Sequence, residues 1–165
     1  MVTNVGRTAL VILLWPILLP TGCTDQARKT SLDGSAEGAQ IVEQHWPGGR
    51  LRLRKEVLRN PDGTVVDHGR YTRWHENGAK EYETTFVRGK KHGTATRWHM
   101  NGRKWIEEHY LNGKRHGAGC SWDASGRKRK EEHHLNGRPH GTWTVWNAAG
   151  KVKSRQHFDA GTPKP

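Results

Sequence analysis

Histidine is the side chain in this sequence most suited to metal binding or acid–base chemistry, and the chain contains 11 of them. Most stand in two columns that repeat every 24 residues: His68, His92, His116 and His140, and His109, His133 and His157. In a sheet, members of one column lie two strands apart, about 10 Å. Two ligands of one zinc ion bring their nitrogens within roughly 3.5 Å. A column therefore cannot chelate an ion, and we predict no metal and no cofactor.

Two pairings remain open, His116 with His133 and His116 with His134, because these residues come from different columns on adjacent strands. The simpler interpretation is that each histidine before a glycine helps to shape and fill a turn.

Catalytic signatures are absent from the sequence. There is no GxSxG, no HExxH and no glycine-rich phosphate loop. A catalytic set needs unlike groups that converge at one place, whereas the polar residues here recur in every unit. Cys120 shares a column with Thr72, Thr96 and Thr144, so we expect a small residue packed in a sheet, with a reactive nucleophile as the alternative. We predict a protein that is not an enzyme and has no catalytic residues.

Positive charge is the next feature that bears on function. Lys and Arg number 28 against 16 Asp and Glu, which gives a net charge of +12. Such a surface attracts polyanions, although it also keeps an exposed sheet soluble. Anionic lipid headgroups are the polyanion we expect, because export from the cell would separate the chain from nucleic acid. The candidate polyanion-binding residues are Arg115, Arg127, Lys128, Arg129, Lys130, Arg138, Lys151 and Lys153.

These side chains are placed by a unit of 24 residues that occurs four times between residues 69 and 161. One tryptophan column and three glycine columns keep the same register. A fixed period of this length is typical of stacked-repeat architectures. The structural repeat positions are Gly69, Trp74, Gly78, Gly89, Gly93, Trp98, Gly102, Gly113, Gly117, Trp122, Gly126, Gly137, Gly141, Trp146, Gly150 and Gly161.

Each unit predicts two strands and leaves no room for a helix. Asn-Gly pairs at residues 77–78, 101–102, 112–113 and 136–137 favour tight primed hairpin turns, because Asn and Gly tolerate positive φ. We therefore expect eight short antiparallel strands. Alternation assigns their faces: we expect the tryptophans and the Thr72 column to share one face with Tyr82, Phe86, Tyr110, Ile106, His134 and Phe158. The opposite face would be charged, with Arg73 and Arg97 paired to Glu83, Glu107 and Glu131.

The pattern Gly-x-x-x-x-Trp-x-x-x-Gly, followed by a Tyr or Phe column and by the Asn-Gly-Lys-x-His-Gly of residues 112–117, resembles the bacterial variant of the MORN repeat. The resemblance covers residues 69–161 well and 46–68 poorly. It implies an all-β fold, an elongated single-layer antiparallel meander of stacked β-hairpins. Related chains are often labelled as antitoxin-family proteins, so it also implies a non-catalytic protein that binds a partner. His134, Gly119, Cys120 and Thr162-Pro163 depart from the pattern.

The N-terminal region predicts a cellular location rather than a folded domain. Arg7, the apolar run from Thr8 to Leu19 and the small residues before Cys23 read as an export signal. The stretch from Leu19 to Cys23 resembles a bacterial lipobox, which makes Cys23 the predicted lipidation site. We assign residues 1–22 to a lipoprotein-type signal peptide, 23–44 to a flexible tether, 45–68 to a degenerate capping repeat, 69–161 to the four repeats and 162–165 to a tail.

The functional prediction is a membrane-anchored, protein-binding repeat module of the bacterial cell envelope. It would act as an antitoxin-like neutraliser or as an envelope scaffold, with an unidentified protein as its partner. Direct binding of anionic lipid headgroups or other polyanions through the basic sheet surface is the alternative.

Overall fold

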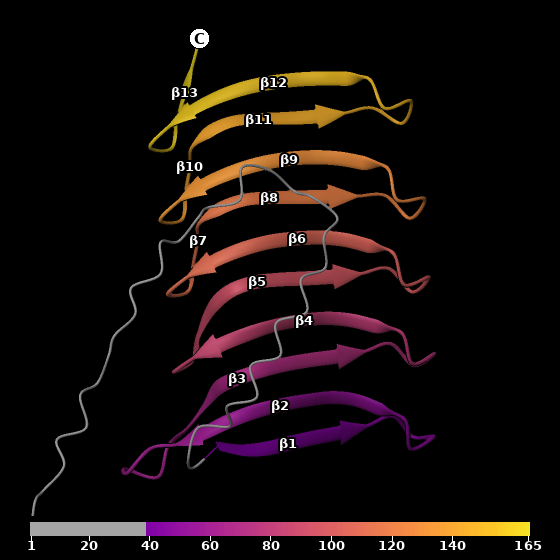
Figure 1. Cartoon of the computed structure of the whole chain (residues 1–165), viewed down its shortest axis with the longest axis vertical. Coiled ribbons are helices and arrows are strands. Elements are labelled where there is room, and N and C mark those ends of the chain that lie inside the picture. The colour runs from indigo at the N-terminus through magenta and orange to yellow at the C-terminus, as the bar shows by residue number, and fades with distance from the viewer. Residues whose placement is uncertain (1–38) are drawn as a thin grey trace, which may run out of the picture.

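The computed structural model describes residues 39–165, which form one open antiparallel sheet of 13 strands. Figure 1 shows the strands stacked along the long axis of the molecule in a single layer. The long strands are β1 (Ala39–His45), β2 (Leu51–Arg59), β3 (Val65–Trp74), β4 (Lys80–Val87), β5 (Lys90–Trp98), β6 (Lys104–Leu111), β8 (Gly117–Trp122), β9 (Lys128–Leu135), β11 (Gly141–Trp146) and β12 (Val152–Asp159). The short strands are β7 (Lys114–Arg115), β10 (Arg138–Pro139) and β13 (Thr162–Lys164).

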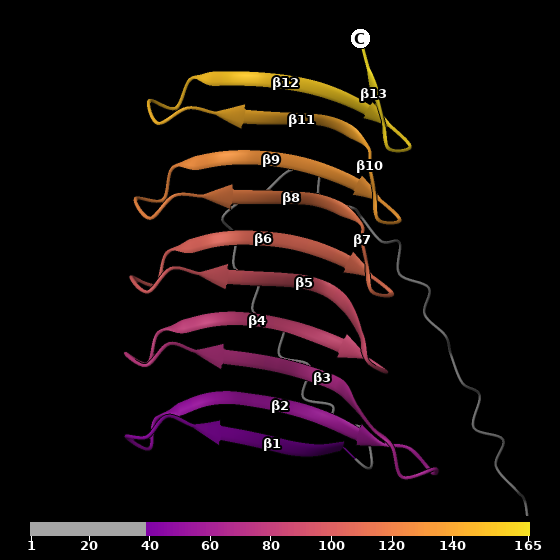
Figure 2. The same cartoon turned by 180° about the vertical axis from the view of Figure 1, so that it is seen from behind.

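The long strands pair in sequence order, so the sheet is a meander, and β7 and β10 each pair only with the long strand before them. The all-β, single-layer hairpin array predicted from the sequence is confirmed. The short strands β7, β10 and β13 lie along one edge of the sheet in both views (Figures 1 and 2). β7 and β10 lead from one repeat into the next. Within the described residues no helix is long and apolar enough to cross a membrane.

The first hairpin begins earlier than predicted. Residues 39–44, which we assigned to the tether, form most of β1, and β1 pairs with β2 along its whole length. Ile41 and Val42 favour a strand, and the partner strand supplies the backbone hydrogen bonds that a tether would lack. The signal peptide, the lipidation site Cys23 and the rest of the tether lie outside the described residues.

Trp46 does not belong to the tryptophan column. It begins a turn, in which the Gly49 amide donates to the Trp46 carbonyl at 2.9 Å, just as the Gly78 amide donates to His75. Its indole Nε1 donates to the carbonyl of Trp74 at 3.3 Å. The capping repeat predicted for residues 45–68 is therefore part of a complete hairpin that starts at Ala39.

From β4 onward the sheet uses a different turn at each of its two long edges. At the edge of the short strands, both turn residues then have positive φ, as in Asn112 (51°) and Gly113 (85°), whereas the turn between β2 and β3 is longer and has positive φ only at Gly63 (84°). The turn at Asn112-Gly113 is the primed turn predicted from Asn-Gly. The same turn occurs at Arg88-Gly89, Asn136-Gly137 and Ala160-Gly161.

At the opposite edge the primed-turn prediction for Asn77-Gly78 and Asn101-Gly102 is wrong. Only the glycine has positive φ there, 84° at Gly78. Asn77 instead uses its side-chain Oδ1 to accept a hydrogen bond from the Ala79 amide at 3.0 Å. The longer turn adds a residue, and the register of β3 and β4 shifts beside it between Arg73 and Trp74.

That shift and the strand pairing overturn the predicted faces. Thr72 lies opposite Glu83, whereas Arg73 lies opposite Tyr82. Directly opposed residues point to the same side of a sheet. The tryptophan and threonine columns therefore share a face with the glutamates, which we call the tryptophan face. The tyrosines and Phe86 share the other face with Arg73 and Arg97, which we call the ladder face. Alternation along one strand could not reveal this, because it does not align one strand with the next.

The packed interior is thin. The buried apolar residues are Leu53, Val57, Ala95, Ala118 and Cys120. The buried polar or charged residues are Thr72, Thr84, Thr96, Glu108, Glu132, His134 and Thr144. Because apolar burial is small, the backbone hydrogen bonds between strands must contribute a large share of the stability.

Gly137→Ala tests the dependence on primed turns. The new Cβ would meet Lys114 at an ordinary 3.7 Å, so the cost comes from the φ of 88° and should be about 1–2 kcal/mol of unfolding free energy. Gly48→Ala is the matched control, because Gly48 does not have a positive φ and a Cβ there meets nothing within 4 Å. We expect the control to change stability by less than about 0.5 kcal/mol in urea titrations. Equal effects of the two changes would contradict this account of the turns.

Candidate functional site

The ladder face begins with a cluster of aromatic rings on β3 and β4. The Tyr71 ring lies 5.9 Å from Tyr82 and 5.6 Å from Phe86. Lys91, on β5, places its ammonium 5.4 Å from the Tyr82 ring and 5.0 Å from the Tyr110 ring. One cation therefore joins the aromatic groups of two successive repeats by cation–π contacts.

The contacts continue into the third and fourth repeats. The Tyr110 hydroxyl donates to Glu108 at 2.9 Å, and Arg115 forms ion pairs with both Glu108 and Glu132. Lys130 binds Glu132 and lies 4.4 Å above the ring of Trp143. The Trp143 ring then contacts Phe158 at 4.7 Å. Rings, cations and carboxylates thus form an unbroken ladder from β3 to β12.

Burial sets the electrostatics of the ladder. Glu108 is only 7% exposed and Glu132 only 9%, so their carboxylates need the cations beside them. Burial raises the pKa of Tyr110, and its hydrogen bond to Glu108 raises that pKa further. Burial also lowers the pKa of His134, whose ring lies 5.2 Å from Trp143. The ladder is therefore a charged but internally compensated structure.

A varied column lies on the ladder face beside the longer turns. Its members are Glu81, Trp105, Arg129 and Lys153, which occupy the register shifts of β4, β6, β9 and β12. Glu81 pairs with Arg73 at 2.7 Å, and Trp105 is 46% exposed. Both line a groove of about 240 Å³ together with Tyr71, Tyr82 and Arg97. Each repeat therefore presents a different chemical group at this position.

The tryptophan face is more uniform. A lysine binds the glutamate three residues later in each of three repeats: Lys80–Glu83, Lys104–Glu107 and Lys128–Glu131. Lys80 also lies 5.6 Å above Trp98, and Lys128 lies 5.8 Å above Trp146. The ion pairs that we predicted between Arg73 or Arg97 and these glutamates do not form, because the arginines are on the other face.

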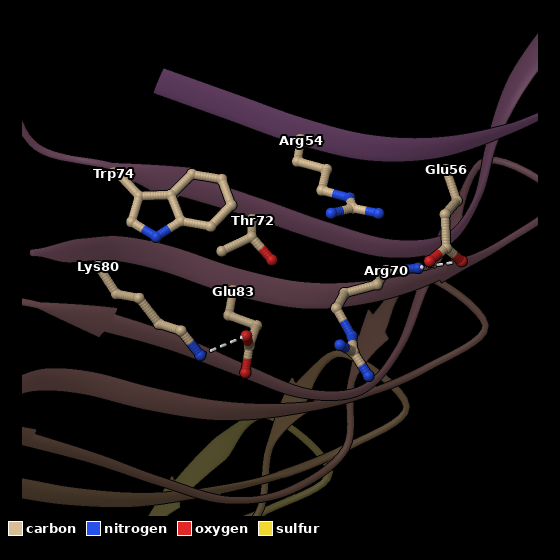
Figure 3. Close-up of a pocket in the computed structure, with 7 residues that line it drawn as sticks. All are labelled: Arg54, Glu56, Arg70, Thr72, Trp74, Lys80 and Glu83. Atoms are coloured by element: carbon tan, nitrogen blue, oxygen red, sulfur yellow. Dashed lines mark hydrogen bonds and ion pairs between the residues drawn. The ribbon is translucent and has the colours of Figure 1, made fainter. Parts of the chain in front are cut away.

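The N-terminal end of the tryptophan face contains a groove of about 270 Å³ (Figure 3). It is lined by Arg54, Glu56, Arg70, Thr72, Trp74, Lys80 and Glu83. The Glu56 carboxylate accepts a hydrogen bond from the Arg70 amide at 3.0 Å, and Lys80 binds Glu83, so both carboxylates are engaged. The Arg70 guanidinium extends over the groove.

The eight predicted polyanion-binding residues do not form one patch. Lys130 belongs to the ladder, whereas Lys128 is on the tryptophan face. Arg115 is engaged by two carboxylates, and Arg127 pairs with Asp123 at 3.5 Å. Arg129 and Lys153 lie in the varied column, Lys151 follows the last of the longer turns, and Arg138 lies at the opposite edge.

That opposite edge has a regular composition that sequence reasoning missed. At the first three primed turns the residue before the turn is exposed and aliphatic, and the residue after it is basic, whereas the fourth turn lies between Asp159 and Thr162. Val87 lies opposite Lys90, Leu111 opposite Lys114 and Leu135 opposite Arg138. The aliphatic residues and the basic residues each recur every 24 residues in the sequence. Only the position of the turns, which the structure gives, shows that the two sets lie opposite each other. We call these six residues the basic–aliphatic edge.

Histidine rings make hydrogen bonds to the turns and between neighbouring strands. The His75 and His99 rings are bonded to the carbonyls of Trp98 and Trp122, each at 3.2 Å. The His116 amide donates to the carbonyl of His109. Among residues 39–165 no three His, Cys, Asp or Glu side chains are grouped to hold a metal ion.

Asparagine side chains also connect the longer turns at residues 75–79, 99–103 and 123–127. Asn77 donates to the carbonyl of Met100 at 2.9 Å, and Asn101 donates to that of Ala124 at 2.8 Å. In the later repeats Asp123 and Asn147 instead accept hydrogen bonds from amides of their own turns.

Fold and surface together define a stacked β-hairpin repeat protein with open faces and no enclosed active-site cleft in the described region. The family described as MORN repeat variant matches residues 67–88 and 139–160, which lie in the second and fifth hairpins. Repeats of this kind are generally non-enzymatic modules that bind proteins or lipids. No curated protein matches the chain.

The buried histidine of the ladder predicts a pH-dependent stability. Because burial lowers the pKa of His134, the folded state binds fewer protons than the unfolded state, and stability should fall as pH drops below the ordinary value of about 6.5. The charged groups around the ring are Glu108, Arg115, Lys130 and Glu132.

His134→Phe, which restores the aromatic residue of its column, should flatten the loss of melting temperature between neutral and mildly acidic pH. His109 also has a pKa lowered by burial, so a smaller acid dependence should remain. His45→Phe, at the exposed end of β1, is the control. Its melting temperature should depend on pH in the same way as that of the original chain. A profile that His134→Phe leaves unaltered would contradict this assignment.

Proposed function

We propose that this chain is a non-catalytic recognition module that binds another protein through its ladder face. The observation that carries the proposal is the contrast between the two faces. The tryptophan face repeats the same lysine, glutamate and tryptophan in successive hairpins. The ladder face presents Glu81, Trp105, Arg129 and Lys153 at one equivalent position. A specific partner requires surface groups that differ along the array.

The chemistry of the ladder face suits a protein partner. Tryptophan and arginine are the residues most enriched at the energetic centres of protein interfaces. Trp105 is exposed beside a groove whose other lining residues include Tyr71 and Arg97, and Arg129 is free of ion pairs within the described residues. The aromatic rings of Tyr71, Tyr82 and Phe86 already pack against one another, so these side chains lose little conformational entropy on binding.

We infer the cellular setting from the sequence of the N-terminal region. A chain tethered through a lipid on Cys23 would present the array at a bacterial membrane, as an envelope scaffold or as an antitoxin-like neutraliser of its partner. This part of the proposal depends on residues 1–23 alone. The mass of the mature N-terminal peptide tests it, since a chain without diacyl modification of Cys23 would have no such anchor.

Crosslinking in extracts of the source organism tests the choice of face. The full chain should enrich a defined protein, and Trp105→Ser combined with Arg129→Ser should lower that enrichment at least tenfold, because interface centres cost about 2 kcal/mol each when truncated. Arg70→Ser combined with His157→Ser on the tryptophan face is the control and should leave enrichment unchanged. If the control pair abolishes capture and the ladder pair does not, the ladder face is not the interface.

A second function, binding to anionic lipid, is favoured by the basic–aliphatic edge. Its cations are exposed, and each lies directly opposite an exposed Val or Leu. Successive pairs are about 10 Å apart, so the edge is a row of short apolar side chains flanked by positive charge. That combination suits the boundary between lipid headgroups and acyl chains.

Vesicle sedimentation tests this second function. A chain with Cys23→Ser should bind phosphatidylserine-containing vesicles, and Lys90→Gln, Lys114→Gln and Arg138→Gln together should weaken binding roughly 100-fold at about 1 kcal/mol per cation. Added salt should weaken it as well. The control removes three cations from the opposite edge, Arg103, Arg127 and Lys151, each changed to Gln. Equal binding to uncharged phosphatidylcholine vesicles would exclude the function.

A further inference from the structure

The outer edge of β12 is only partly covered by a partner strand. β13 pairs with His157, Phe158 and Asp159 and with no earlier residue of β12. In the preceding repeat, β10 covers the same part of β9, and β11 then pairs with the remainder, where Thr144 lies opposite Glu131. β13 therefore takes the place of β10. No strand among residues 39–165 takes the place of β11, so Val152 to Gln156 present unpaired backbone groups.

The other end of the array presents a strand of the missing type. Among residues 39–165, β1 pairs with β2 alone. Figures 1 and 2 show that β1 runs in the same direction as β3, β5, β8 and β11. Each of those four strands is the first strand of its hairpin and pairs with the second strand of the preceding hairpin. A second copy moved along the long axis would therefore bring β1 antiparallel to β12.

The register of the repeats determines which residues would meet. Glu43 lies opposite Arg54, as Thr144 lies opposite Arg155. Glu43 is thus the β1 counterpart of Thr144. On β12, Arg155 is the counterpart of Glu131, which lies opposite Thr144 of the next hairpin. Continuing the array into a second copy places Glu43 of that copy directly opposite Arg155.

The charges of the two edges are complementary. β1 carries one carboxylate, Glu43, and no lysine or arginine, whereas β12 carries Lys153 and Arg155 beside its open segment. Two β12 edges would bring like charges together, which is unfavourable. The contact between β1 and β12 is the pairing that brings opposite charges together. It would also cover Ile41 and Val152, which are 55% and 44% exposed.

We propose that copies of this chain stack end to end, with β12 of one copy pairing with β1 of the next and Glu43 bonded to Arg155 across the junction. The contact uses two different surfaces and displaces each copy along the long axis, so it continues without closing and produces a filament. Ten long strands per copy give a rise of about 48 Å. The proposal does not depend on the partner of the ladder face.

Charge reversal with mixing tests the junction. The full chain in one non-ionic detergent should show sedimentation coefficients that rise with protein concentration and fall with added salt. Glu43→Arg alone and Arg155→Glu alone should each lower the association constant about tenfold, because each places like charges opposite each other. Arg103→Glu makes the same change in net charge as Arg155→Glu, in a turn away from both edges, and should leave association unchanged.

Mixing the two charge-reversed chains should restore association, because each junction then regains one carboxylate and one guanidinium. This result distinguishes a contact between copies from damage to the fold, including loss of the ion pair between Glu43 and Arg54, which are 3.6 Å apart. A chain that stays monomeric, a closed dimer insensitive to Arg155→Glu, or two variants that do not rescue each other would overturn the proposal.

Discussion

Hydrogen bonding between neighbouring strands is the constraint on which the rest of this molecule depends. A single layer has no second sheet to pack against, and only five apolar side chains are buried in the described part of the chain. Each hairpin therefore stabilises the next chiefly through its backbone, and stability is closer to a sum over neighbouring pairs than to the property of one core. Every other regularity of the sequence serves that pairing. Glycine permits the turns, and columns of side chains line up because the strands do.

The side chains that do pack are polar or amphipathic, which fits a sheet that is wet on both sides. On the ladder face Lys91 and Lys130 cover aromatic rings while their charges remain near solvent. Glu108 and Glu132 are buried but are held by Arg115 between them. A chain of low apolar content can thus link five hairpins without a conventional core. The arrangement also leaves the outer ends of many side chains available to a partner.

Local features were predictable from the sequence, and relations between strands were not. The period, the hairpins and the primed turn at Asn112-Gly113 follow from residues adjacent in the chain. The assignment of faces failed because the extra residues at Glu81 and Trp105 shift one strand against the next, and a shift of one residue moves side chains to the other face. β1 was missed because its partner lies beyond a turn headed by Trp46, which imitates the tryptophan column. The basic–aliphatic edge required both the period and the turn positions.

The hydrogen bonds between the longer turns give the array unequal cohesion along its length. Asn77 and Asn101 each reach into the following turn, whereas Asp123 and Asn147 bind only within their own. The early hairpins should consequently open together as one cooperative unit, while the last hairpin frays independently. Amide exchange and proteolytic trimming would then begin at the C-terminal hairpin and reach the early hairpins last, in a single cooperative step.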